Sequence, residues 1–255
     1  MYSEAKRCIY ENNQLAEVIC QLRFPEILTI KTQTPTEFQE VIRSVFPHYS
    51  ANKEILPTNT NPGNGNINMN YQFMSEDGKW RVNLTSKFIS LTCADYTCWE
   101  AFAKKLDLPL AAFIKTYNPA LFERIGLRYI NFFSRSALQL TDKPFSELFT
   151  PPYLGLLGDD DVKETSTARS SIDAQIKIKG GNHLNIHAGP GIVKKKGQTD
   201  QEIKFILDLD FYSMGNTPIN YAAVTLESLH SQSYPVFRGA ITNTLHEALG
   251  PDNDD

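Results

Sequence analysis

The sequence predicts an α+β protein built as a tandem pseudo-repeat, with antiparallel sheets that are each covered by a long helix. Two segments of strand composition, residues 15–24 and 123–133, open two series of elements that lie roughly 110 residues apart. Each series runs strand, helix, three strands, long helix. Because the apolar face of an antiparallel sheet must be covered, one long helix per sheet is a physically sensible arrangement. We therefore expect a first α+β unit over residues 1–120, a second over residues 121–250 and a disordered acidic tail over residues 251–255.

Proline residues delimit the first two elements. Residues 15–24 carry β-branched side chains in rough alternation and end before Pro25, which predicts a strand. Residues 36–46 follow Pro35 and place apolar side chains at helical spacing up to Pro47, which predicts a short amphipathic helix.

The rest of the first unit reads as a meander followed by a helix. Residues 57–66 are rich in Asn, Gly, Pro and Thr, the composition of an exposed loop. Three short strand candidates follow near residues 69–74, 79–84 and 88–93. Residues 95–116 keep an apolar stripe at helical spacing, although Pro109 should break or kink this helix.

The second unit repeats this order. Residues 123–133 predict a strand, and residues 144–149 predict a short helical turn. Three strand candidates follow near residues 168–178, 183–192 and 203–211. A helical region over residues 218–249 should be interrupted at Pro235.

Composition excludes several classes of protein. The chain has 25 Lys plus Arg against 29 Asp plus Glu, so no global cationic field is available to hold nucleic acid or an anionic membrane. The four cysteines form no C-x-x-C motif, which argues against a disulfide framework or a structural zinc site. The N-terminus lacks the basic and apolar regions of a signal peptide, and no long apolar run could span a bilayer. We expect a cytoplasmic protein without a membrane partner.

Common catalytic motifs are missing as well. The segment around Gly189 to Gly197 only superficially resembles a phosphate loop, because Gly197 is followed by Gln198 and not by Lys and a hydroxyl residue. The nucleophile elbow, the S-x-x-K motif and the dinucleotide fingerprint do not occur. We therefore expect no cofactor, no metal and no catalytic residues, and a binding protein is favoured over an enzyme.

One strand carries a family resemblance. Residues 124–131 (RIGLRYIN), together with Glu17-Val18-Ile19, Trp99-Glu100-Ala101-Phe102 and Leu229-His230, resemble a sporadically distributed bacterial and archaeal family of uncharacterised proteins of about 250 residues. The resemblance spans nearly the whole chain. It implies no activity, but the patchy distribution is similar to that of mobile defence and toxin–antitoxin genes.

The same strand offers a candidate ligand-binding surface. Arg124, Gly126 and Arg128 share one face of it, since side chains alternate along a strand. Two arginines separated by a glycine could present an anion-binding surface to which a ligand approaches closely. The alternative, which we favour, is that both arginines form structural ion pairs.

A second candidate is a basic hairpin. Its side chains are Lys177, Lys179, His183, His187, Lys194, Lys195 and Lys196. These residues could bind RNA, or cleave it without a metal if histidine serves as acid and base. A solvated loop is the alternative that we favour. His183 and His187 lie on one strand face about 13 Å apart, too far to share a metal.

These patterns favour a non-enzymatic binding protein, an accessory, antitoxin-like or immunity-related component of a bacterial defence or toxin–antitoxin system. The partner would be a protein that a neighbouring gene could encode. The alternative is an RNA-binding module or a metal-independent RNA-processing enzyme that uses the basic hairpin. An unpaired sheet edge in either half would also invite a partner strand or a second copy of the chain.

Overall fold

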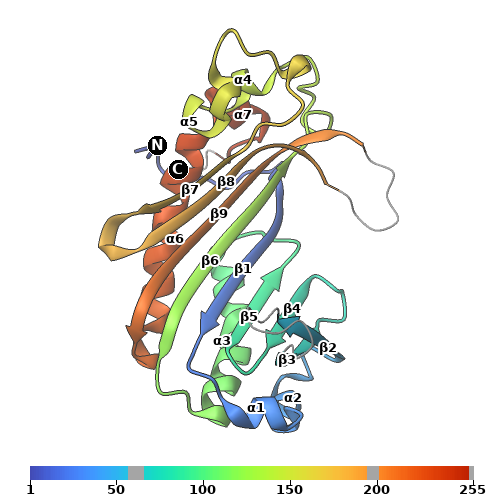
Figure 1. Cartoon of the computed structure of the whole chain (residues 1–255), viewed down its shortest axis with the longest axis vertical. Coiled ribbons are helices and arrows are strands. Elements are labelled where there is room, and N and C mark those ends of the chain that lie inside the picture. Colours follow the sequence, from blue (N-terminus) through green and yellow to red (C-terminus); the bar gives the residue numbers. More distant parts are fainter. Residues whose placement is uncertain (57–65, 194–200, 253–255) are drawn as a thin grey trace. The chain divides into compact units, whose positions relative to one another are not determined.

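The computed structural model describes residues 1–56, 66–193 and 201–252, and it contains a sheet of nine strands (Figure 1). The order of strands across the sheet is β2-β3-β4-β5-β1-β6-β9-β8-β7. The strands are β1 (Leu15–Arg23), β2 (His48–Leu56), β3 (Asn66–Met74), β4 (Trp80–Leu84), β5 (Phe88–Cys93), β6 (Phe122–Phe133), β7 (Ile172–Lys177), β8 (His183–Ile192) and β9 (Ile203–Thr217). The helices are α1 (Leu28–Thr32), α2 (Thr36–Ile42), α3 (Trp99–Tyr117), α4 (Phe145–Leu148), α5 (Pro151–Leu154), α6 (Ala222–Ala240) and α7 (Asn243–Ala248).

The predicted fold class, a tandem pseudo-repeat of separate antiparallel sheets, is wrong. The strands β1 and β6, which were expected to open two different sheets, are neighbours in one sheet. Strand β2 was not predicted, and four strands instead of the expected three lie between α2 and α3. A single sheet has fewer open strand edges than two sheets would have. If β1 and β6 belonged to different sheets, each would leave a row of backbone N–H and C=O groups unpaired on the side where the two strands now meet.

Prolines do not interrupt the two long helices. Pro109 lies inside α3 and Pro235 lies inside α6, and each helix runs for 19 residues. Pro109 is itself buried, so the contacts of its ring with the core offset the hydrogen bond that a proline cannot donate. In the residues that are described, no helix combines the length and apolar composition needed to cross a bilayer.

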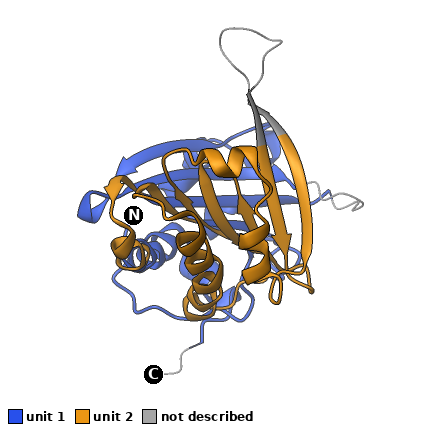
Figure 2. Ribbon diagram, turned by 90° about the horizontal axis from the view of Figure 1, so that it is seen from below, with its two compact units in different colours: residues 1–17, 128–212, 227–255 blue, residues 18–127, 213–226 orange. Residues whose placement is uncertain are grey.

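The described chain divides into two compact units, which are coloured separately in Figure 2. Unit 1 comprises Met1–Glu17, Arg128–Tyr212 and Glu227–Asp255. Unit 2 comprises Val18–Leu127 and Ser213–Leu226. Each unit is therefore assembled from segments that are distant in the sequence.

The core of unit 2 forms between its strands and α3. Phe102 and Phe113 of α3 are fully buried, and the ring centroid of Phe113 lies 4.6 Å from that of Phe24. Val82 and Leu91, which face each other across the β4–β5 pair, are also fully buried. The helical stripe predicted near residues 95–116 thus covers the apolar face of these strands.

The core of unit 1 forms between its strands and the later part of α6. Phe149 and Phe205 are stacked with ring centroids 3.7 Å apart, and both are fully buried. Tyr129 of β6 reaches α6, since its hydroxyl lies 2.9 Å from Nδ1 of the buried His230. This contact identifies the helix-covered face of β6, so the residues that alternate with Tyr129 face away from α6.

The N-terminal segment runs along α6 in unit 1. The amide of Ser3 donates to the carbonyl oxygen of Pro235 at 2.8 Å. A Cβ atom placed on Gly239 would overlap the carbonyl oxygen of Met1, so only glycine allows this approach. The amide of Asp252 donates to the carbonyl of Ile9, while residues 253–255 of the predicted acidic tail lie outside the described residues.

Candidate functional site

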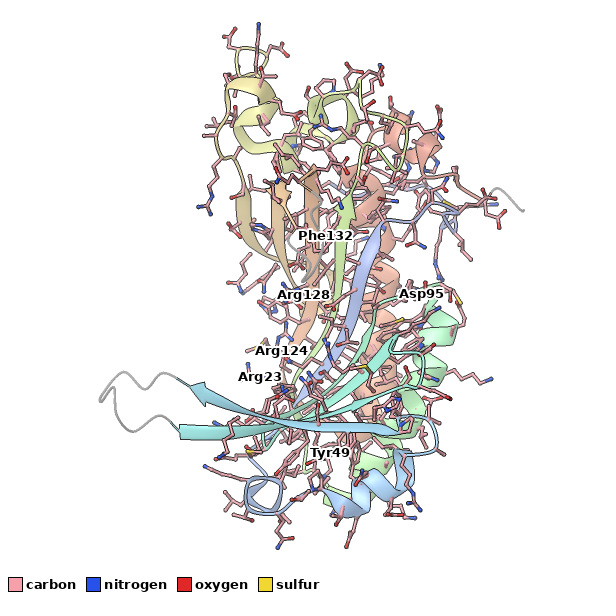
Figure 3. The ribbon with its side chains drawn as sticks, turned by 90° about the vertical axis from the view of Figure 1, so that its right-hand side faces the viewer. Arg23, Tyr49, Asp95, Arg124, Arg128 and Phe132 are labelled. Atoms are coloured by element: carbon pink, nitrogen blue, oxygen red, sulfur yellow. The ribbon has the colours of Figure 1, made fainter. Side chains whose placement is uncertain are left out.

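The face of unit 1 that points away from α6 carries the polar side chains. Leu207 and Leu209 of β9 are buried in the core, and Asp208 and Asp210 alternate with them on the opposite face. Arg128 lies on the same side, next to Tyr129 in the sequence of β6 but pointing away from α6 (Figure 3). The polar face is therefore a direct consequence of strand alternation.

A row of charged side chains crosses four strands on this face. Arg128 of β6 donates two hydrogen bonds to Asp208 of β9, of which the Nε–Oδ1 bond is 2.7 Å long. Asp208 lies opposite His187 of β8, and His187 lies opposite Asp173 of β7. Nδ1 of His187 is 2.7 Å from Oδ1 of Asp173. The order along the row is therefore cation, carboxylate, imidazole, carboxylate.

A second row of uncharged and acidic side chains runs beside the first. Asn185 lies opposite both Asp210 and Gln175, and its Nδ2 donates to Oδ2 of Asp210 at 3.2 Å. Nε2 of Gln175 donates to the hydroxyl of Tyr212 at 2.7 Å. These side chains hold one another in place from three adjacent strands.

The two rows line an open pocket of about 530 Å³. Its lining residues are Arg128, Asp173, Ala174, Gln175, Asn185, Ile186, His187, Asp208 and Asp210. Three carboxylates thus face one guanidinium and one imidazole. The three carboxylates outnumber the guanidinium, so the site carries a net negative charge.

The one arginine of the pocket is already engaged. Its hydrogen bonds to Asp208 hold the pKa of the Arg128 guanidinium above its ordinary value, against the opposing effect of partial burial. The side chain of Asp208 is 13% exposed and that of Arg128 is 45% exposed, so this is a partly desolvated ion pair. The ion-pair alternative stated for Arg128 agrees with this geometry.

Arg124 belongs to unit 2 and has a different environment. A Cβ atom placed on Gly126 would overlap the guanidinium of Arg124, so this side chain lies across the glycine. The space that was considered for a ligand is filled by Arg124 itself. Its charge also acts on the fully buried Cys20, whose thiol pKa burial raises to about 12 while Arg124 opposes that rise.

The residues of the predicted basic hairpin are only partly brought together. His183 stacks on Tyr212 with ring centroids 5.1 Å apart, and Lys177 lies opposite His183. Lys179 lies in the turn between β7 and β8, whereas His187 belongs to the acidic pocket. The remaining predicted residues, Lys194, Lys195 and Lys196, lie outside the described residues.

Several pocket residues were not predicted from the sequence. Asp173, Gln175 and Asn185 come from two strands whose polar residues alternate with apolar ones. That alternation marks a solvent-facing side, but it does not reveal which strands are neighbours. Asp208 and Asp210 share one face of β9 by strand alternation, but their pairing with Arg128 and Asn185 depends on the sheet order.

The ionisable side chains that line the pocket are three carboxylates, one guanidinium and one imidazole. Among the lining residues that are described there is no serine, cysteine or lysine to act as a nucleophile. No group of three or more His, Cys, Asp or Glu side chains in the described part of the chain is arranged to hold a metal ion. The His187–Asp173 pair could orient an imidazole, but the Asp173 side chain is 77% exposed.

No model of a known protein family matches the sequence, and no curated protein matches it. The resemblance of residues 124–131 to a family therefore stays a prediction.

Proposed function

We propose that this protein is a non-enzymatic binding protein, and that its acidic pocket receives a basic side chain of a protein partner. The observation that carries the proposal is the charge of the pocket: Asp173, Asp208 and Asp210 outnumber Arg128, which is already paired. A lysine or arginine side chain would meet the carboxylates of Asp173, Asp208 and Asp210 in this pocket. The amide groups of Asn185 and Gln175 supply further hydrogen-bonding partners.

The same charges disfavour a phosphate in this pocket. A polyanion would have to approach three carboxylates, and the guanidinium that could receive it is bound by Asp208. RNA binding is kept as the alternative because Tyr212 and His183 form a stacked pair with Lys177 opposite His183. Because Tyr212 is itself buried, a base could stack only on the outer face of the His183 ring, with Lys177 near its phosphate.

The biological role is proposed from the family resemblance alone. An accessory, antitoxin-like or immunity-related component of a defence system would act by holding another protein. Many toxins that act on nucleic acid carry basic surfaces for the phosphate backbone, and an acidic pocket is complementary to such a surface. The partner would then be encoded close to this gene.

Binding of a labelled probe peptide tests the proposal. We would measure fluorescence anisotropy with Gly-Lys-Gly-Lys-Gly and, separately, with a single-stranded RNA of about 12 nucleotides, at low and high salt. We expect the peptide to bind and RNA not to bind. Asp210→Asn should weaken the peptide about three- to tenfold, since it removes one charge from the pocket.

Asp142→Asn is the matched control, because Asp142 is an exposed carboxylate of the same unit outside the pocket. It should leave peptide binding unchanged. Equal losses in Asp142→Asn and Asp210→Asn would mean that only the net charge matters, and the pocket would lose its role. Binding of RNA alone would favour the platform of His183 and Tyr212.

A further inference from the structure

Strand β7 is at one end of the sheet order. All six of its residues pair with β8, and the backbone hydrogen bonds described for β7 involve no other strand. The amide of Ile178 donates to the carbonyl of Asn182 at 2.8 Å. Because hydrogen-bonded and non-hydrogen-bonded residue pairs alternate along an antiparallel pair, this bond shows which residues of β7 bond to β8. Ile172, Ala174 and Ile176 therefore bond to β8. The backbone groups of Asp173, Gln175 and Lys177 point to the open side.

The open edge is accessible along its length. Asp173, Ala174, Gln175 and Lys177 are all exposed. The side chains of Asp173, Gln175 and Lys177 lie on the pocket face, while Ile172, Ala174 and Ile176 lie on the core face. Their partners on the core face of β8, Leu184, Ile186 and Ala188, are buried. The apolar row of the core thus ends in partly exposed side chains at β7.

The order of residues on this edge is self-complementary. If a second copy of β7 runs antiparallel and Gln175 lies opposite Gln175 of that copy, then Asp173 lies opposite Lys177 and Lys177 lies opposite Asp173. On the core face, Ala174 lies opposite Ile176, and Ile172 lies opposite Ile178. Opposite charges meet on one face and apolar side chains meet on the other.

We propose that two copies of this chain associate through their β7 edges into a two-fold symmetric dimer with one continuous sheet. The backbone groups of Asp173, Gln175 and Lys177 are the ones that such a pairing requires, because residues directly opposite each other in this register exchange both hydrogen bonds. The interface is isologous, as in most homodimers. Association also removes an unprotected strand edge.

The dimer adds a residue to the pocket described above. Asp173 lines that pocket and holds His187, and it is the residue that would meet Lys177 of the second copy. Each copy would therefore place a lysine at the rim of the other's pocket. The proposal does not depend on the proposed function, because it concerns the edge of the strand and not the ligand.

Charge-swapped variants test the dimer by sedimentation velocity. The purified chain should be dimeric over protein concentrations of about 1 to 100 µM. In Asp173→Lys, lysines face lysines, and in Lys177→Glu, acids face acids. Each variant alone should dimerise roughly ten- to hundredfold more weakly. An equimolar mixture of the two should restore the dimer, since every pair then has opposite charges, and this restoration also shows that both variants are folded.

A backbone variant provides an independent readout. Gln175→Pro removes an amide that points to the open side and breaks no bond to β8, so it should abolish the dimer. Gln175→Ala keeps the amide and is the matched control, and it should remain dimeric. A monomeric wild-type chain over the whole concentration range would overturn the proposal. So would a dimer that survives both Gln175→Pro and the single charge changes.

Discussion

Nδ1 of His187 lies 2.7 Å from Oδ1 of Asp173, across the pair formed by β8 and β7. Asp173 therefore contributes to two features at once: it orients an imidazole inside the acidic pocket, and its backbone faces the open side of the sheet. A ligand in the pocket and a strand on the edge would both contact this one carboxylate. Changes at position 173 should affect both, whereas Asp210 should affect the pocket alone.

Arg128→Ala separates the two classes of ligand considered for the pocket. Removal of the guanidinium makes the pocket more negative, so the lysine peptide should bind a few-fold more tightly. The binding of an anionic ligand would be weakened instead. The free energy of unfolding should fall by about 1–2 kcal/mol, because the carboxylate of Asp208, which is only 13% exposed, loses its charged partner.

The double variant Arg128→Ala/Asp208→Asn is the control for this stability effect. Asparagine leaves no uncompensated charge, so the double variant should regain part of the loss. Urea titrations of the single and double variants measure the difference. If the loss of unfolding free energy in the double variant equals the sum of the losses in Arg128→Ala and Asp208→Asn, the ion pair does not contribute to stability.

Gly239→Ala should lower the free energy of unfolding, although a glycine-to-alanine change within a helix usually raises it. Alanine normally gains about 1 kcal/mol within a helix. Here the added methyl group would overlap the carbonyl oxygen of Met1, and we expect a loss of roughly 1–2 kcal/mol. In a chain that lacks residues 1 and 2 the same change should become neutral or stabilising. Stabilisation of the full chain by Gly239→Ala would contradict the observed path of the N-terminal segment.

Tyr129→Phe should destabilise unit 1 without changing its shape. The tyrosine hydroxyl is hydrogen-bonded to Nδ1 of His230, and both side chains are buried. Loss of this hydrogen bond inside the core should cost about 1–2 kcal/mol in the free energy of unfolding. Phe211→Leu is a comparison that removes only apolar contacts on the same face, since Phe211 lies edge-on to Tyr129. Unchanged stability in Tyr129→Phe would mean that water replaces the hydroxyl.

Stability should fall as the solution is acidified through the range in which His246 titrates. Burial lowers the pKa of His246, and the charge of Arg238 lowers it further. The folded chain therefore favours the neutral ring of His246 more than the unfolded chain does. The contribution of His246 to the free energy of unfolding is complete above about pH 6.5 and is lost as the pH falls through the lowered pKa of the folded state. The hydroxyl of Tyr10, 2.8 Å from Nδ1, shares in this loss.

His246→Gln isolates this contribution. The glutamine amide can still hydrogen-bond to Tyr10 but does not titrate, so the variant should lose less stability between about pH 7.5 and about pH 5 than the wild type does. Guanidinium titrations at both pH values give the comparison. Identical pH dependence in the two proteins would assign the effect to other groups.

Local patterns in the sequence predict local structure well in this chain. The strand expected near residues 88–93 is β5, and the strand expected over residues 15–24 is β1 with one residue fewer at its end. Strand β2 was missed because the alternation of Tyr49 and Ala51 with polar residues is short and stops at Lys53, and because β2 lies at an end of the sheet order. A strand with only one neighbour needs no apolar face to form its hydrogen bonds.

The single sheet and the acidic pocket depend on information that no local pattern contains. Alternation places Asp208 on the solvent side of β9, but only the sheet order brings Arg128 within reach of it. The same holds for Asp173 and His187, which are 14 residues apart in the sequence and meet only in the observed register. Cross-strand pairing is a tertiary property, so the charge of the pocket was not predictable from the sequence.

The discontinuous make-up of the two units sets an order of events during synthesis. Unit 1 combines Met1–Glu17 with Glu227–Asp255, and unit 2 combines Val18–Leu127 with Ser213–Leu226. Neither unit can close before its later segment has left the ribosome, so the strands that are made first stay exposed until then. We therefore expect the nascent chain to recruit chaperones until the segments that follow β9 have emerged.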